Sequence, residues 1–175
     1  MANRETLQAL QARLADRLQA VHAEAGKEAQ WLAVQAGGRN YLVPLSQAGE
    51  IYPWQLPKGL PYTQSWFLGV VNLRGSLVGV MDVAQFLGHP QQRTEQRLQQ
   101  ANIITVHAGF EMNAAILVDR LMGLRGGKDG LAESPDRGVS HACLGPAYVD
   151  GEGQLWQELQ LQALVELPHF LHVRL

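Results

Sequence analysis

The chain has 175 residues, of which 46% are hydrophobic and 17% are charged, and its formal net charge is −2. This composition is typical of a globular fold and excludes a disordered chain, and the length suits one domain or two small lobes. Lysine occurs only three times and no basic stripe is present, which argues against nucleic acid and anionic membrane surfaces as main partners.

Cysteine usage and the N-terminal sequence bear on location. Cys143 is the only cysteine, so no internal disulfide can form, and this fits a reducing compartment. The chain opens with the polar sequence MANRETLQ, which is unlike a secretory signal. No apolar run approaches the roughly 20 residues that cross a bilayer. We therefore expect a cytoplasmic protein without direct membrane insertion.

Residues 1–28 are predicted to form an N-terminal amphipathic helix. Apolar residues recur at three- and four-residue spacing, with Thr6 as a candidate N-cap and Gly26 ending the pattern. The helix either packs its apolar stripe on its own domain, which is the commoner arrangement, or docks on a partner.

From Trp31 the pattern changes to that of short strands separated by turns. A hairpin is expected around the turn at 37–40, and Pro44 indicates a strand end. The proline-bearing stretch 52–63 is predicted to be loop or extended chain. A second hairpin is expected from two apolar runs, 66–73 and 77–83, with residues 72–76 at its tip.

The second half repeats this pattern after a polar segment. Residues 91–100 are rich in Gln and indicate a solvent-exposed link, so we place a link between two lobes near 88–101. Further strands are expected at 102–107, 112–118, 143–149 and 154–159, a loop at 124–136, and a C-terminal helix at about 160–171 that Pro168 would break or end. Many short strands with regular turns predict barrels or a sandwich.

The polar residues give little sign of catalysis or of metal or cofactor binding. The six histidines are dispersed, and neither His141 with Cys143 nor His169 with His172 has a second half at metal-site spacing. His141 and Cys143 would share one face of a strand, but no third group of a catalytic set is evident. We therefore expect no metal, no cofactor and no enzyme activity.

Two pairs of charged residues stand out. Asp82 and Asp119 each end an apolar run, where turn or capping roles are commoner than catalysis, and no other residue is identified that converges on them. Glu50 and Arg74 each lie among apolar residues. A charge in such a setting is costly to bury unless it is paired. We therefore predict a partly buried Glu50–Arg74 ion pair that pins the hairpin tip to the adjoining strand, against the alternative that each residue is solvated independently.

The same residues carry a family resemblance. The chain resembles the CheW family of chemotaxis coupling proteins at Glu50-Ile51, in the proline-bearing link, in FLGVVNLRG at 67–75 and in VMDV at 80–83. In addition, AILVD at 115–119 is similar to a later segment of that family. The likeness runs from about residue 30 to 164, and 69–75 is its most specific part. LWQEL at 155–159 and PHFL at 168–171 resemble the PilI-like branch, which serves type IV pilus twitching motility.

The resemblance implies a mainly β domain over 29–175, with two small five-stranded SH3-like β-barrel lobes side by side and peripheral N- and C-terminal helices. It also implies a non-catalytic adaptor without cofactors, recruited to membrane-associated receptor arrays. Its partners would be the regulatory domain of a CheA-type histidine kinase and the cytoplasmic tip of a methyl-accepting chemoreceptor. By position in the family motifs, the partner-binding residues would be Ala48, Glu50, Ile51, Gly69, Asn72, Arg74, Leu121 and Leu124.

Three other classes of protein remain as alternatives. A nucleic-acid-binding barrel needs basic and aromatic residues on one face, whereas only 7% of this chain is aromatic. Another protein-binding β-barrel module would fit the same composition. An enzyme needs a polar constellation in a pocket, such as His141, Cys143 and a converging carboxylate.

Overall fold

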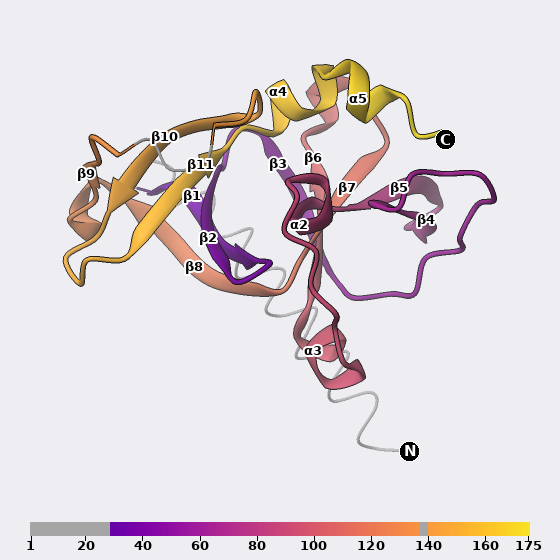
Figure 1. Cartoon of the computed structure of the whole chain (residues 1–175), viewed down its shortest axis with the longest axis horizontal. Helices are drawn as coiled ribbons and strands as arrows, with labels where there is room; N and C mark the ends of the chain where they lie inside the picture. The colour runs from indigo at the N-terminus through magenta and orange to yellow at the C-terminus, as the bar shows by residue number, and fades with distance from the viewer. Residues whose placement is uncertain (1–28, 137–139) are drawn as a thin grey trace.

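The computed structural model describes residues 29–136 and 140–175, which fold into two β-sheets lying side by side with a few short helices (Figure 1). The predicted helix over residues 1–28 lies outside the described residues. In the described part, no helix has the length and apolar character needed to cross a membrane.

The first sheet has six strands and contains the first two strands and the last four. Its strand order is β8 (Arg120–Gly126), β1 (Ala29–Ala36), β2 (Arg39–Pro44), β11 (Leu155–Leu159), β10 (Leu144–Val149) and β9 (Ala132–Glu133). The β2–β11 pairing is parallel and the others are antiparallel. Gly37 and Gly38, at φ 59° and 75°, form the two-residue turn between β1 and β2, which confirms the first predicted hairpin.

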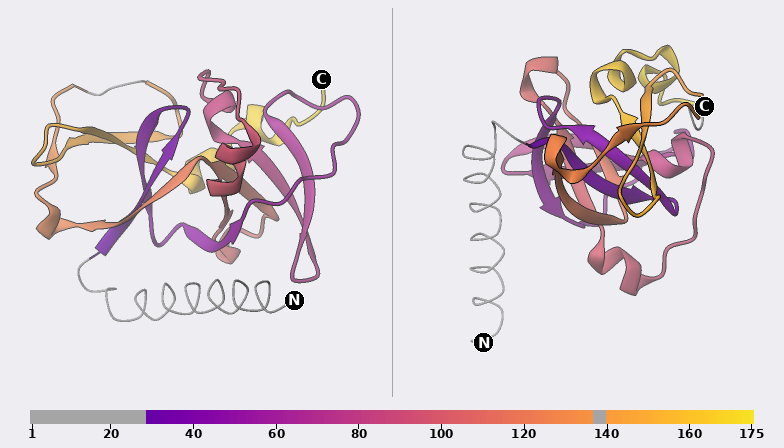
Figure 2. Two further views of the ribbon diagram at one scale, coloured as in Figure 1. Left: turned by 90° about the horizontal axis from the view of Figure 1, so that it is seen from below. Right: turned by 90° about the vertical axis from the view of Figure 1, so that its left-hand side faces the viewer.

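The second sheet has five strands and contains the middle of the chain. Its strand order is β3 (Ala48–Pro53), β6 (Asn102–Val106), β7 (Ala114–Val118), β5 (Ser76–Asp82) and β4 (Phe67–Leu73). All five residues of β7 are buried, as expected for a central strand covered on both faces. Arg74 and Gly75, both at positive φ, turn β4 into β5, which confirms the second predicted hairpin. This hairpin projects from the body of the molecule (Figure 2).

The two sheets interleave along the chain. It enters the six-stranded sheet with β1 and β2, builds the whole five-stranded sheet, and returns with β8 to β11. The mainly β, two-lobed fold class is thus confirmed, although the lobes have six and five strands and neither described sheet closes into a barrel. The prediction that residues 88–101 link two lobes is wrong. That segment, which includes α3 (Glu95–Gln100), joins β5 to β6 within one sheet. The order of the strands along the chain does not reveal a parallel pairing such as β2–β11, whose strands are more than 100 residues apart in sequence.

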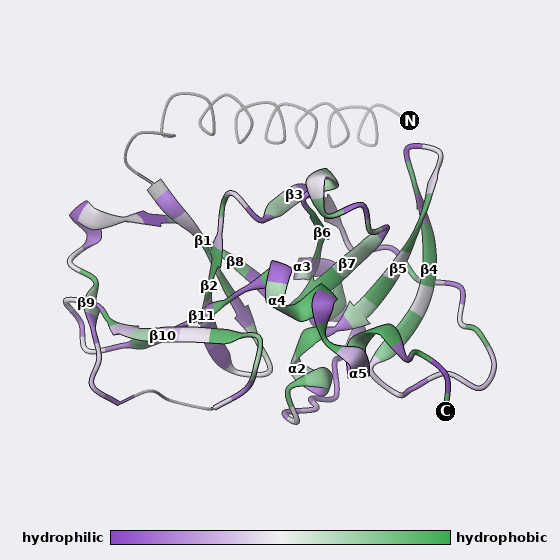
Figure 3. Cartoon of the chain, turned by 90° about the horizontal axis from the view of Figure 1, so that it is seen from above, coloured by the Kyte–Doolittle hydropathy of each residue, from purple (hydrophilic) through white to green (hydrophobic). Residues whose placement is uncertain are grey.

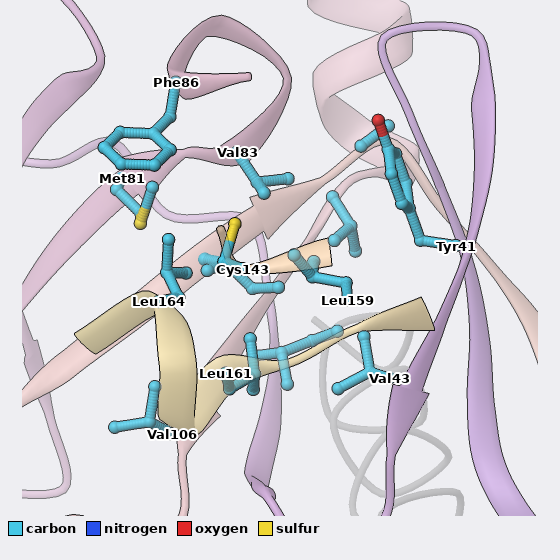
Figure 4. Close-up of a cluster of buried hydrophobic side chains, with 14 of the residues drawn as sticks. Tyr41, Val43, Met81, Val83, Phe86, Val106, Cys143, Leu159, Leu161 and Leu164 are labelled. Atoms are coloured by element: carbon cyan, nitrogen blue, oxygen red, sulfur yellow. The ribbon is translucent and has the colours of Figure 1, made fainter. Parts of the chain in front are cut away.

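The largest core lies where the two sheets meet and takes residues from both. Its side chains include Val43, Met81, Val83, Val106, Leu159, Leu161 and Leu164 (Figure 4). The apolar character of β4, β5 and β7 is evident in Figure 3. The short helices α2 (Val83–Phe86), α4 (Leu161–Glu166) and α5 (Pro168–Leu171) cover this core. The C-terminal helix forms near the predicted range but is broken, because Leu167 is extended ahead of Pro168.

Candidate functional site

The predicted contact between Glu50 and Arg74 is present. Arg74 Nη1 lies 3.3 Å from Glu50 Oε1, joining β3 to the tip of the β4–β5 hairpin. The predicted partial burial is wrong, because the side chains of Arg74 and Glu50 are 68% and 44% exposed. An exposed pair of this kind adds little to stability. Two opposite charges are therefore displayed together on the surface.

Tyr52 makes this pair a three-residue cluster. Its hydroxyl donates a hydrogen bond to Glu50 Oε2, and the Arg74 guanidinium carbon lies 5.8 Å from the centre of the Tyr52 ring. Burial raises the pKa of the Tyr52 hydroxyl, with a further contribution from its bond to Glu50, so the hydroxyl remains a donor. Sequence reasoning missed Tyr52, although its position two residues after Glu50 puts both side chains on the same face of β3.

A groove of about 300 Å³ opens beside this cluster. Glu50, Tyr52 and Arg74 line it together with apolar residues from β4, β5, β6 and the segment before β7: Leu73, Val78, Val106 and Met112. The hairpin tip also carries Leu77, whose side chain is 62% exposed. Apolar walls next to opposite charges form a surface suited to a protein partner, where anchoring side chains fill pockets and charges set the register.

The hairpin is shaped by Asn72 and Gly69. Asn72 is exposed, and its Oδ1 accepts a hydrogen bond from Gly75 N at 2.8 Å, which holds Arg74 in the turn. Gly69 is buried at φ 126°, and a Cβ there would lie 2.2 Å from Lys58 O. Gly69 therefore serves the close approach of the proline-bearing loop to β4.

The apolar candidates are less exposed than the charged ones. Ala48 is buried, at 8% exposed, and Ile51 is partly buried against the main core. Leu121 and Leu124 are also partly buried against that core and lie on β8, an edge strand of the other sheet. Leu124 was predicted to lie in a loop but belongs to β8. The structure thus brings Glu50, Asn72 and Arg74 together at the hairpin and places Leu121 and Leu124 on the other sheet.

A second ionic cluster was not foreseen. Asp82, at the end of β5, and Asp119, between β7 and β8, both accept hydrogen bonds from the guanidinium of Arg93. The side chains of Arg93 and Asp82 are only 8% and 5% exposed. The predicted capping role of Asp82 is confirmed, since Oδ1 accepts from Gln85 N at the start of α2. The expectation that no residue converges on the two aspartates is wrong.

Asp119 extends this cluster to the six-stranded sheet. Its Oδ2 accepts a hydrogen bond from Gly37 N at 2.7 Å, in the β1–β2 turn. A Cβ on Gly37 would lie 2.8 Å from Ala84 Cβ and 2.9 Å from His89 O, so this turn packs directly on the segment after β5. The ion cluster fixes the relative positions of the two sheets.

His141 and Cys143 do meet, with Nδ1 and Sγ 3.1 Å apart. Cys143 is fully buried beside Met81 and Leu164 (Figure 4). Burial raises the pKa of its thiol to about 11, and burial together with nearby His169 lowers the pKa of His141. The thiol is therefore protonated at neutral pH, the opposite of an activated nucleophile. Among the described residues, no three His, Cys, Asp or Glu side chains gather as metal ligands would.

Two interleaved β-sheets that display a charged cluster beside an apolar groove define a β-rich binding module. The family model described as CheW-like domain matches residues 30–169, so this chain belongs to the CheW-like family. That finding confirms the resemblance seen in the sequence.

Individual relatives agree with this assignment. Protein PilI of Pseudomonas aeruginosa is 31% identical over 109 residues, which cover 58% of this chain and 59% of PilI. Chemotaxis protein CheW of Bacillus subtilis is 30% identical over 60 residues, 34% of this chain and 38% of that protein. Each match thus spans less than two thirds of the relative. The crystal structure of the scaffolding protein TtCheW from Thermoanaerobacter tengcongensis superposes with a TM-score of 0.64 at 16% identity, covering 81% of this chain and 94% of that one, which shows a shared fold.

Proposed function

We propose that this protein is a non-catalytic adaptor that couples chemoreceptors to a CheA-type histidine kinase in a chemosensory system controlling type IV pilus twitching motility. Membership of the CheW-like family supports the adaptor role, and the similarity to PilI supports the link to pili. The structural observation that carries the proposal is the exposed Glu50–Tyr52–Arg74 cluster at the edge of an apolar groove.

Two surfaces would serve the two partners. The hairpin surface consists of Glu50, Asn72 and Arg74, and the β8 surface consists of Leu121 and Leu124. Ala48, Ile51 and Gly69 would act mainly by shaping the hairpin surface, since they are buried or partly buried. The regulatory domain of the kinase and the cytoplasmic tip of the receptor would each occupy one surface. The protein would work in the cytoplasm at membrane-associated receptor arrays, where repeated weak contacts gain strength through multivalency.

The proposal is tested by titrating the full chain against the kinase regulatory domain and, separately, against the receptor tip. Arg74→Ala is the main variant, because Arg74 is 68% exposed and its removal leaves no buried partner unpaired. We expect saturable binding by the wild type and at least about tenfold weaker binding of one partner by the variant. Arg97→Ala serves as the matched control, since Arg97 is an exposed arginine on α3, outside both surfaces.

Leu124→Asp probes the β8 surface, and its folding must be verified by circular dichroism because Leu124 packs partly on the core. Loss of the second partner by a folded Leu124→Asp variant would support the two-surface arrangement. An absence of binding to both partners at high micromolar concentration would refute the coupling role while leaving the family assignment intact. Salt-dependent binding of single-stranded nucleic acid instead would favour the alternative class.

A further inference from the structure

The proline-bearing loop between β3 and β4 is paired with the last residues of the chain. Thr63 and Arg174 form an antiparallel bridge, Gln64 N donates to Val173 O at 2.7 Å, and Leu175 N donates to Tyr62 O at 3.0 Å. The Gln64 side chain adds a bond to Arg174 O at 3.0 Å. Two segments far apart in sequence thus form one ordered ladder, and Figure 1 shows them on the same side of the molecule.

The ladder brings the backbones of two large, exposed apolar residues together. The Leu175 N–H bonds to the Tyr62 carbonyl, and these two residues are 83% and 81% exposed, respectively. Leu60 lies on the same loop at 46% exposed, and its carbonyl accepts a bond from Thr63 Oγ1. We call Leu60, Tyr62 and Leu175 the loop–tail patch. Large exposed apolar side chains on two paired segments are typical of an interaction site.

Tyr62 is also held in an unfavourable backbone conformation. Its φ of 58° lies in the left-handed region, where a Cβ crowds the backbone. The Leu175–Tyr62 and Gln64–Val173 hydrogen bonds enclose this residue and keep it there. Strain that persists around an exposed side chain is a reason to look for a function at that position.

The charged side chains around the patch all have one sign. Segments 54–66 and 167–175 contain no Asp or Glu, whereas Lys58 and Arg174 are both exposed. Neither cation forms an ion pair with a described residue. An apolar patch flanked by unpaired cations complements an apolar segment that carries carboxylates. Two cations and three apolar side chains are too few for stable membrane anchoring, which takes a polybasic cluster or a longer amphipathic face.

We propose that the loop–tail patch binds an acidic amphipathic segment of a partner protein. The patch adjoins the start of β4, whereas Arg74 follows its end, and the seven residues of β4 separate the two by roughly 20 Å. Figure 2 shows the C-terminus and the hairpin tip at opposite ends of this part of the molecule. A partner on the patch leaves the hairpin surface free, so the inference does not depend on which partners occupy that surface.

The test uses a synthetic 18-residue helical peptide with Leu on one face and Glu on the other, and a matched peptide in which Lys replaces each Glu. Binding to the full chain is followed by NMR shifts of the protein amides. The test variant combines Tyr62→Gly with Leu175→Ser. Glycine accommodates a φ of 58° without strain, so the ladder is expected to stay folded. Leu155→Ser is the matched control, because Leu155 is 43% exposed on β11, away from the patch.

We expect saturable shifts at 58–64 and 173–175 with the acidic peptide, at least tenfold weaker binding by the patch variant, and unchanged binding by the control. A Lys58→Glu, Arg174→Glu variant should lose affinity for the acidic peptide to a similar degree. Absence of saturable shifts, equal binding of the Lys peptide, or shifts elsewhere would overturn the proposal. So would patch-dependent binding to phosphatidylserine vesicles or patch-dependent self-association in sedimentation, because each assigns the patch to a different occupant.

Discussion

The guanidinium of Arg93 forms hydrogen bonds with both carboxylate oxygens of Asp82. Nη1 donates to Oδ2, and Nη2 donates to Oδ1 at 3.1 Å, while Nε is left to donate to Asp119. Arginine can form this bidentate pair with a carboxylate, and lysine cannot. Asp119 also accepts a hydrogen bond from Gly37 N, so Arg93 and Asp119 together connect the end of β5, the segment between β7 and β8 and the β1–β2 turn. These hydrogen bonds hold the two interleaved sheets in a fixed position relative to each other.

Replacing Arg93 with Met should destabilise the fold strongly. The variant leaves the Asp82 carboxylate, only 5% exposed, and that of Asp119 without their cation. Removing one partner of a buried ion pair typically lowers the free energy of unfolding by about 3–5 kcal/mol. Urea unfolding followed by tryptophan fluorescence measures the loss.

Arg97→Met is the matched control for this prediction, because Arg97 lies on the same segment but is exposed. It should change stability by less than about 0.5 kcal/mol. Equal stability of the Arg93 and Arg97 variants would show that the buried ion cluster does not join the sheets. Arg93→Lys should recover only part of the loss, since an ammonium cannot grip Asp82 and reach Asp119 together.

Gly69→Ala should be far more harmful than Gly75→Ala, although both glycines have positive φ. A Cβ at Gly69 would meet Lys58 O at 2.2 Å, whereas nothing lies within 4 Å of a Cβ at Gly75. We expect a loss of roughly 3 kcal/mol or more for Gly69→Ala, and about 1–2 kcal/mol for Gly75→Ala, where only backbone strain is added. Thermal unfolding of the two variants decides the order, and the reverse order would contradict the packing of the loop on β4.

The hairpins were predictable because their signals are local. Gly37-Gly38 and Arg74-Gly75 lie between apolar runs, and two-residue turns with positive φ follow from that arrangement. The interleaving of the sheets was not predictable in this way. The parallel pairing of β2 with β11 has no signal in the sequence of either strand, and two groups of strands of similar length along the chain predict two successive lobes.

In the candidate site, too, features with local sequence signals could be predicted, whereas features that depend on the fold could not. Glu50 and Arg74 could be paired from their apolar surroundings, but their exposure depends on the projecting hairpin. The burial of Arg93 could not be predicted, because it lies in a Gln-rich segment whose composition indicates a solvent-exposed link. This buried ion cluster takes one residue from each of three separate segments, so only the fold reveals it. Leu124 was assigned to a loop because the glycines around it outweigh the strand pattern of β8.

Cys143 should react slowly with iodoacetamide in the folded protein. Its thiol pKa is raised by burial from the ordinary 9.0 to about 11, which reduces the reactive thiolate about 100-fold, and full burial also denies access. Labelling at neutral pH should therefore be at least about 100-fold slower than in concentrated urea, as measured by mass spectrometry. Labelling at comparable rates in both conditions would show that His141 activates the thiol, and would reopen an enzymatic role.

Asp150 should confer a pH-dependent part of the stability. Its Oδ2 accepts from the indole N–H of buried Trp156 at 2.9 Å, and its Oδ1 accepts from Gln154 N and Glu152 N. These bonds, that from Trp156 foremost, lower the pKa of the Asp150 carboxyl below its ordinary value. A carboxyl with a lowered folded-state pKa stabilises the fold above its unfolded-state pKa, and this contribution disappears as pH falls through the folded-state pKa.

Asp150→Asn should therefore be less stable than the wild type at pH 7, because the amide places a donor against the Trp156 N–H or offers it a weaker acceptor. The difference should narrow as pH falls below about 4, because the Asp150 carboxyl then takes up a proton in the unfolded chain before it does so in the folded protein. Urea unfolding between pH 7 and pH 3 measures this, with Glu166→Gln as the control, since Glu166 is exposed on α4. A difference that stays constant over this range would mean that the bond to Trp156 does not depend on the charge of Asp150.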